Sequence, residues 1–189
     1  MIPIELTTID HWVSWKQAGT DKKPLDPTGR VANALDQVNW QSLIKVMIMF
    51  QPQCCDIDMQ VDSTFNEHHL MDGMLHLLCS KCRSGRHVPL ENTNVGFVLT
   101  GDYCVIDGDH EPWITILTDK FVERTYCEVS PSGGIHVWLK GSMKNHRDNF
   151  EVYSNKRWMT VTGMGNDLDI MEIQEEDKKW ILKMIKSKK

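Results

Sequence analysis

The protein has 189 residues, of which 41% are hydrophobic and 25% charged, and its 21 Lys and Arg against 26 Asp and Glu leave a net charge of −5. This length corresponds to one domain or two small ones, and the composition excludes a disordered, collagen-like or coiled-coil chain. The negative charge argues against a protein that coats nucleic acid by charge alone, although it is compatible with a local basic groove.

The first fifty residues predict a strand, a loop and a helix. Residues 8–16 hold two tryptophans and are typical of an entry strand or turn, and residues 22–30, rich in Pro, Gly and Asp, predict an irregular loop. Apolar side chains recur at helical spacing over residues 36–50, which predicts a helix. Its apolar run is far shorter than a membrane span, and the N-terminus lacks the pattern of a signal peptide. We therefore expect a cytoplasmic protein.

Residues 51–94 form a segment rich in cysteine and histidine, which we interpret as an insert. Its middle, residues 66–78, predicts a helix with loops on either side. In a reducing cytoplasm we expect its cysteines to be free thiols or metal ligands and not disulfides.

Four cysteines of this insert are candidate ligands of a structural Zn²⁺ ion: Cys54, Cys55, Cys79 and Cys82. The two ligands besides Cys79 and Cys82 could also come from the histidines of the insert: His68, His69, His76 and His87. Cys79 and Cys82 have the two-residue spacing of half a zinc site, whereas Cys54 and Cys55 are adjacent and lack it. Buried free thiols are the alternative for all four. Cys104 and Cys127 lie in predicted strands, where we expect core thiols.

From residue 95 the pattern changes to short strands. Six are predicted, at residues 95–99, 103–106, 125–129, 135–139, 150–153 and 158–162. Residues 130–134 predict the tight turn of a hairpin, and residues 112–123 and 172–187 have the spacing of helices. The sum is an α+β fold, with a domain at residues 1–170 that carries the insert and a C-terminal amphipathic helix at residues 171–189.

Three motifs in this half carry residues suited to phosphate chemistry. The first holds Asp107 and Asp109 at the end of a predicted strand. Alternate residues of a strand share a face, so the two carboxylates would project together and hold one or two divalent cations. Two such cations about 3.5–4 Å apart serve phosphoryl transfer. The alternative is an Asp-Gly turn after an edge strand.

The second motif is the predicted hairpin. The backbone N–H groups of its turn, at Ser132, Gly133 and Gly134, form a candidate anion cradle. His136 and Lys140 are in phase on the returning strand and could bind a triphosphate beside that turn. The alternative is a hairpin with a core histidine.

The third motif holds Glu151, the single acid of an otherwise apolar strand, and Arg157. An inward carboxylate is costly unless it is paired or bound to a metal, and the alternative is a solvated, outward-facing glutamate. Arg157 is a candidate phosphate ligand.

In this order, the motifs resemble the catalytic domain of the archaeo-eukaryotic primase superfamily, in particular the primase-polymerase domains at the N-terminus of phage and plasmid replication proteins. The resemblance rests on residues 12–15, 22–30, 96–99, 106–110, 125–141 and 151–163. It implies an RRM-like, mixed or antiparallel sheet that carries the acids and packs with helices and with an N-terminal α/β unit.

The resemblance implies a template-directed nucleotidyltransferase, a DNA primase and DNA polymerase that starts primers and extends them. Asp107, Asp109 and Glu151 would be catalytic and hold two Mg²⁺ or Mn²⁺ ions, and His136 would contact the phosphates of the incoming nucleotide. Four further basic residues are carried over as phosphate or template contacts: Lys23, Arg30, Lys140 and Arg157. One departure is Gly134, where the family often has serine two residues before the histidine. A backbone amide could replace that hydroxyl.

The partners implied are a single-stranded DNA template, dNTP or NTP and a helicase, in the cytoplasm of a bacterial or phage-infected cell. A non-catalytic module of a larger replication protein, which binds nucleotide or single-stranded DNA, is the alternative. A metal-dependent phosphoesterase or a rolling-circle nicking enzyme is disfavoured. The latter would need two histidines separated by one residue, whereas His68 and His69 are adjacent.

Overall fold

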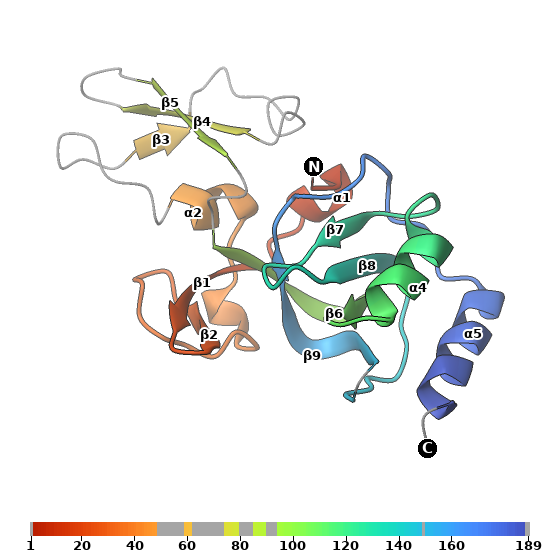
Figure 1. Ribbon diagram of the computed structural model, residues 1–189. Helices are drawn as coiled ribbons and strands as arrows, with labels where there is room; N and C mark the ends of the chain where they lie inside the picture. The colour runs from red at the N-terminus through yellow and green to blue at the C-terminus, as the bar shows by residue number, and fades with distance from the viewer. Residues whose placement is uncertain are drawn as a thin grey trace. The chain divides into compact units, whose positions relative to one another are not determined.

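The computed structural model describes residues 2–48, 59–61, 74–79, 85–89, 94–148 and 150–187 (Figure 1). The fold is α+β, as predicted, and contains a six-stranded antiparallel sheet of order β2-β1-β6-β8-β7 in which β9 also pairs with β6. The chain divides into two compact units. The N-terminal unit comprises Met1–Phe97 and Thr160–Met164, and the C-terminal unit comprises Val98–Met159 and Gly165–Lys189.

The N-terminal unit begins with α1 (Ile4–Thr7), β1 (Trp12–Ala18) and β2 (Asp21–Leu25). The predicted entry strand is β1, which pairs with β2 in antiparallel register. The prediction of a loop over residues 22–30 was wrong for its first half, which belongs to β2. This strand is last in the order of the sheet, where Pro24 is tolerated because its missing N–H needs no partner.

The predicted helix over residues 36–50 is divided in the structure. A 3₁₀ turn, η1 (Gln37–Asn39), is followed by α2 (Leu43–Ile48). Between them Gln41 exchanges backbone hydrogen bonds with Trp12, at 2.9 and 3.1 Å. These bonds hold the chain extended at a point where the apolar spacing alone predicts a continuous helix.

A second, three-stranded antiparallel sheet consists of β3 (Met59–Val61), β4 (Met74–Cys79) and β5 (Gly85–Pro89). The predicted helix over residues 66–78 was therefore wrong from residue 74 on, and β3 and β5 occupy predicted loops. A short apolar run has no periodicity that separates a buried strand from a helix. Cys79 is the last residue of β4. Of the other candidate zinc ligands, His76 of β4 lies opposite His87 of β5. The rest lie outside the described residues: Cys54, Cys55, His68, His69 and Cys82.

The C-terminal unit contains most of β6 (Val95–Gly108), followed by α4 (Trp113–Phe121), β7 (Cys127–Val129), β8 (Ile135–Lys140), β9 (Glu151–Val161) and α5 (Glu175–Lys186). Both predicted helices and the β7–β8 hairpin are confirmed. The predicted pairs of strands over residues 95–106 and 150–162 are instead the single strands β6 and β9. Gly101, at φ 113°, and Lys156, at φ 51°, bend these strands without ending them.

One face of this unit's sheet carries its hydrophobic core. Strand residues such as Ile106, Val137 and Val152 pack there with the helical residues Leu117 of α4 and Ile181 of α5. Cys104 and Cys127 are buried free thiols, as predicted. Since neighbouring residues of a strand point to opposite faces, the residues beside these core positions project from the face that the helices do not cover. No helix within the described residues is long and apolar enough to cross a membrane.

Candidate functional site

Three adjacent strands place Asp107, His136 and Glu128 side by side across the sheet. Asp107 of β6 lies opposite His136 of β8, which lies opposite Glu128 of β7. The imidazole lies between the two carboxylates, with Nε2 3.6 Å from Asp107 Oδ1 and Nδ1 3.2 Å from Glu128 Oε1. Each of the three neighbours a core residue along its strand, so the group projects from the face opposite α4 and α5.

Glu128 is a site residue that our reading of the sequence missed. It is only 2% exposed, and besides facing His136 it accepts hydrogen bonds from Tyr126 Oη at 3.0 Å and Trp138 Nε1 at 3.3 Å. Burial and the adjacent Glu128 charge raise the pKa of Tyr126 far above its ordinary value, so the phenol stays a donor. The register of the predicted hairpin was the signal available, because a turn over residues 130–134 places residue 128 opposite residue 136.

Asp107 lies at the centre of the predicted acidic group. Its side chain is 12% exposed, and Oδ1 is buried without a hydrogen-bond partner among the described residues. Burial is the main cause that raises the pKa of Asp107; His136 lowers it, Asp109 and Glu151 raise it, and Arg157 lowers it. The fold therefore brings the three predicted acids, the histidine and Arg157 within electrostatic reach of one another.

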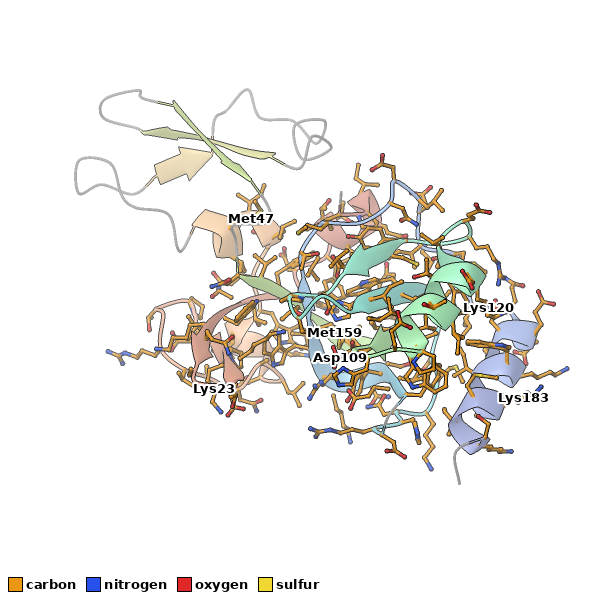
Figure 2. All side chains as sticks on the ribbon, viewed as in Figure 1. Lys23, Met47, Asp109, Lys120, Met159 and Lys183 are labelled. Atoms are coloured by element: carbon orange, nitrogen blue, oxygen red, sulfur yellow. The ribbon has the colours of Figure 1, made fainter. Side chains whose placement is uncertain are left out.

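Asp109 is exposed and lies just beyond the end of β6 (Figure 2). Its Oδ1 accepts a hydrogen bond from Ser132 Oγ at 3.1 Å, and Ser132 Oγ lies 3.1 Å from Ser130 Oγ. The β7–β8 turn is thus tied to Asp109 by a hydroxyl that the sequence reading had assigned only as part of an anion cradle.

The glycines of this turn have two different constraints. Gly133 has a φ of 86°, a backbone conformation that favours glycine. At Gly134 a Cβ would lie 2.5 Å from the carbonyl oxygen of Gly108, so no side chain fits at the position where primase-polymerases, which the motifs resemble, often have serine. Gly134 N–H donates to Ser130 Oγ at 3.0 Å and Gly133 N–H to Ser130 O at 2.9 Å. Both amides are used within the turn, so the Gly134 amide does not stand in for the serine hydroxyl.

Strand β9 places Glu151 and Tyr153 on the face that carries Asp107, because Val152 between them is in the core. Tyr153 Oη donates to Glu151 Oε2 at 2.6 Å, and the Glu151 side chain is 25% exposed. The Arg157 guanidinium lies 4.7 Å from the centroid of the Tyr153 ring, and its Nε is buried without a hydrogen-bond partner in the described part of the chain. Glu151 is thus neither unpaired nor fully solvated.

Lys140 is a predicted contact within the C-terminal unit that lies away from this group. Lys140 shares the face of His136 but lies opposite Tyr103, four residues or about 13 Å further along the strands. Lys23 and Arg30 belong to the N-terminal unit, where Lys23 Nζ pairs with Asp21 at 3.0 Å.

Comparisons of the chain with protein-family models and with curated proteins found no match. The resemblance to primase-polymerases rests on the motifs and on the positions described above.

Proposed function

We propose that this protein is a template-directed nucleotidyltransferase, a DNA primase and polymerase. The observation that supports this most directly is Asp107, whose buried Oδ1 has no hydrogen-bond partner among the described residues. Asp109 and Glu151 influence its pKa, as do the cationic or potentially cationic Arg157 and His136. Acids and bases with perturbed pKa values in one place are typical of functional sites.

The donor set suits Mg²⁺ or Mn²⁺, which prefer carboxylate oxygens. Asp107 Oδ1 is the atom that best fits a cation, because a buried carboxylate oxygen without a partner is costly. Among the described residues no three His, Cys, Asp or Glu side chains stand together as a ready-made metal group, so Asp109 and Glu151 would have to turn toward the ion. When bound, two divalent cations would activate an attacking hydroxyl and offset charge on the reacting phosphate.

The protein's own side chains would bind and orient the nucleotide. His136, held between two carboxylates, is placed to contact the triphosphate near Asp107. The stacking of Arg157 on Tyr153 leaves its buried Nε–H as a candidate phosphate donor. Ser132 would keep Asp109 in place beside the turn. Lys140 would contact template or phosphate only at a distance from this group. Lys23 and Arg30, of the N-terminal unit, would also contact template or phosphate.

We also propose that the C-terminal unit is RRM-like and that the N-terminal unit corresponds to the α/β unit of primase-polymerases. Support comes from the order β6-α4-β7-β8-β9 and from the two faces of the sheet, one covered by helices and one carrying the acids. The partners would be single-stranded DNA, dNTP or NTP and a replicative helicase, in a bacterial or phage-infected cytoplasm. We also propose that the cysteine-rich insert binds a structural Zn²⁺ ion. Metal analysis of the purified protein tests this, and a zinc content well below one ion per chain would refute it.

The test is incorporation of labelled dNTP or NTP on a single-stranded template with Mg²⁺ or Mn²⁺. Wild type is compared with Asp107→Ala/Asp109→Ala and with Asp167→Ala/Asp169→Ala, a control with the same spacing at two exposed positions. We expect product in the wild type and the control and none in the Asp107/Asp109 variant. Nucleotide or DNA binding without product would favour the non-catalytic module. Product that survives the loss of Asp107 and Asp109 would refute the site.

A further inference from the structure

Glu128 is the most deeply buried acid of the site, yet the proposed function gives it no part. We propose that Glu128 is a positioning residue, which accepts a hydrogen bond from Nδ1–H of His136 and so keeps Nε2 directed toward Asp107 and the nucleotide phosphates. This inference rests on the proposed function and adds to it the residue that orients the phosphate-binding histidine.

The contacts of His136 determine which nitrogen carries a proton. Nδ1 lies 3.2 Å from Glu128 Oε1, and Nε2 lies 3.6 Å from Asp107 Oδ1 on the opposite side of the ring. An ionised carboxylate is only an acceptor, so Nδ1 must be the donor in its bond to Glu128. A histidine whose Nδ1–H is bonded in this way has a fixed ring orientation. Its Nε2 donates to Asp107 or to a phosphate when that nitrogen also carries a proton.

The surroundings of Glu128 hold its carboxylate in the orientation that this role needs. Oε1 receives the indole N–H of Trp138 at 3.3 Å and Oε2 receives the hydroxyl of Tyr126 at 3.0 Å. Both donors come from strand positions next to the β7–β8 hairpin, so they keep the carboxylate facing His136. A buried glutamate is costly unless its oxygens are hydrogen-bonded, and Tyr126 and Trp138 supply such bonds here.

Glu128→Gln keeps an oxygen that can accept a hydrogen bond from His136 but removes the negative charge of the carboxylate. The indole N–H of Trp138 can only donate, so the amide oxygen must occupy the Oε1 position that also faces His136. The amide NH₂ then points to Tyr126 Oη, which can accept a hydrogen bond. Glu128→Met removes the acceptor at similar length, and Tyr126→Phe is the matched control, because it takes a hydrogen bond from Glu128 without touching the oxygen that faces His136.

The first measurement is imidazole ¹⁵N NMR, with the His136 signals assigned by their loss in His136→Gln. We expect a protonated Nδ1 in the wild type, in Glu128→Gln and in Tyr126→Phe. An unprotonated Nδ1 in the wild type would overturn the proposal. This measurement on the wild type requires neither a destabilised variant nor an active enzyme.

The second measurement is steady-state nucleotide incorporation, below the unfolding temperature of each variant. In Glu128→Met we expect the nucleotide KM to rise about 10–100-fold, the usual cost of losing a group that orients a ligand histidine, with a smaller change in kcat. Glu128→Gln, which keeps the acceptor, should stay close to wild type, and Tyr126→Phe should raise the KM less than Glu128→Met, because Oε1 still receives the Trp138 indole N–H. A folded Glu128→Met with the wild-type KM, or a Tyr126→Phe as impaired as Glu128→Met, would contradict the proposal. Absence of product from the wild type, with Nδ1 protonated, would instead refute the proposed function alone.

Discussion

Asp177 and Asp107 are two acids that the C-terminal unit buries, and their surroundings differ sharply. The Asp177 side chain, on α5, is 0% exposed and accepts two hydrogen bonds from the Arg124 guanidinium, at 3.0 and 3.1 Å. Lys120 Nζ of α4 adds a third cationic contact at 3.5 Å. Asp107 has a buried oxygen with no hydrogen-bond partner among the described residues, and its nearest basic group in those residues is His136 at 3.6 Å.

The difference separates a carboxylate that stabilises the fold from one that is kept available. Around Asp177 cations neutralise the buried charge and attach α5 to the core, where Lys120 also lies 5.0 Å from the Trp180 ring centroid. Around Asp107 the fold gathers further carboxylates, which oppose its ionisation. Like charges without enough counter-charge are costly in a folded chain and are typical of sites that bind a cation or catalyse a reaction.

The largest effect should follow from Asp107→Asn. We expect incorporation of nucleotides to fall at least about 10³-fold, or about 4 kcal/mol, because the amide is a far poorer ligand for a divalent cation. The free energy of unfolding should not fall, since the exchange removes an unfavourable buried charge. Primer-extension rates and urea unfolding measure the two quantities, with Asp167→Asn as the exposed control. Activity within tenfold of the wild type would mean that Asp107 is not a catalytic ligand.

Asp177→Asn should show the opposite pattern. We expect the free energy of unfolding to fall by about 2–3 kcal/mol, somewhat below the loss for a fully buried pair, because Arg124 and Lys120 are 34% and 25% exposed and can reach water. Incorporation measured below the unfolding temperature should be unchanged. Urea unfolding gives the first quantity.

The matched control for Asp177 is Glu175→Gln. This substitution breaks the ion pair between Glu175 and Lys178, which are 2.7 Å apart and exposed to solvent. It should not measurably change the free energy of unfolding. Equal losses from the two variants would show that burial does not distinguish these pairs.

Binding of Mn²⁺ should stabilise the wild type through Asp107. At an ion concentration ten times Kd, we expect the free energy of unfolding to rise by about 1.4 kcal/mol. The gain should disappear in Asp107→Asn and persist in Asp167→Asn/Asp169→Asn. Unfolding followed over a Mn²⁺ titration measures it, and an equal gain in Asp107→Asn would place the ion elsewhere.

The smallest effect concerns pH. The folded-state pKa of Asp107 is raised above the ordinary 3.8, so its ionisation opposes folding at neutral pH. This penalty is present above the folded pKa and is relieved as pH falls through it toward 3.8. Without added metal, the advantage in stability of Asp107→Asn over wild type should therefore shrink between pH 7 and pH 4. If the stability advantage of Asp107→Asn grew as the pH fell, the pKa of Asp107 would be lowered in the folded protein and not raised.

Local signals predicted part of this structure well. The β7–β8 hairpin follows from a turn of small residues in which Gly133 adopts a positive φ, and α5 from an acidic start, a basic end and helical spacing. Other predictions were wrong because they depended on pairing between strands that lie far apart in the sequence. β6 continues through Gly101, because β1 pairs with residues before that glycine and β8 with residues after it. β9 continues through Lys156 as one strand that pairs with β6. The apolar run of β4 predicts a helix, but its pairing with β3 and β5 makes it a strand.

The sequence by itself determined the α+β class, the hairpin, the terminal helix and the identity of Asp107, Asp109, His136 and Glu151 as candidates for one site. These depend on short-range spacing and on which side chains can hold phosphate or metal. Only the tertiary structure decided that Glu128 lies against His136, that the Gly134 amide is occupied and that an oxygen of Asp107 is buried without a hydrogen bond. Burial and cross-strand register arise from segments far apart in the chain, and they determine whether a carboxylate stabilises the fold or is held ready for a ligand.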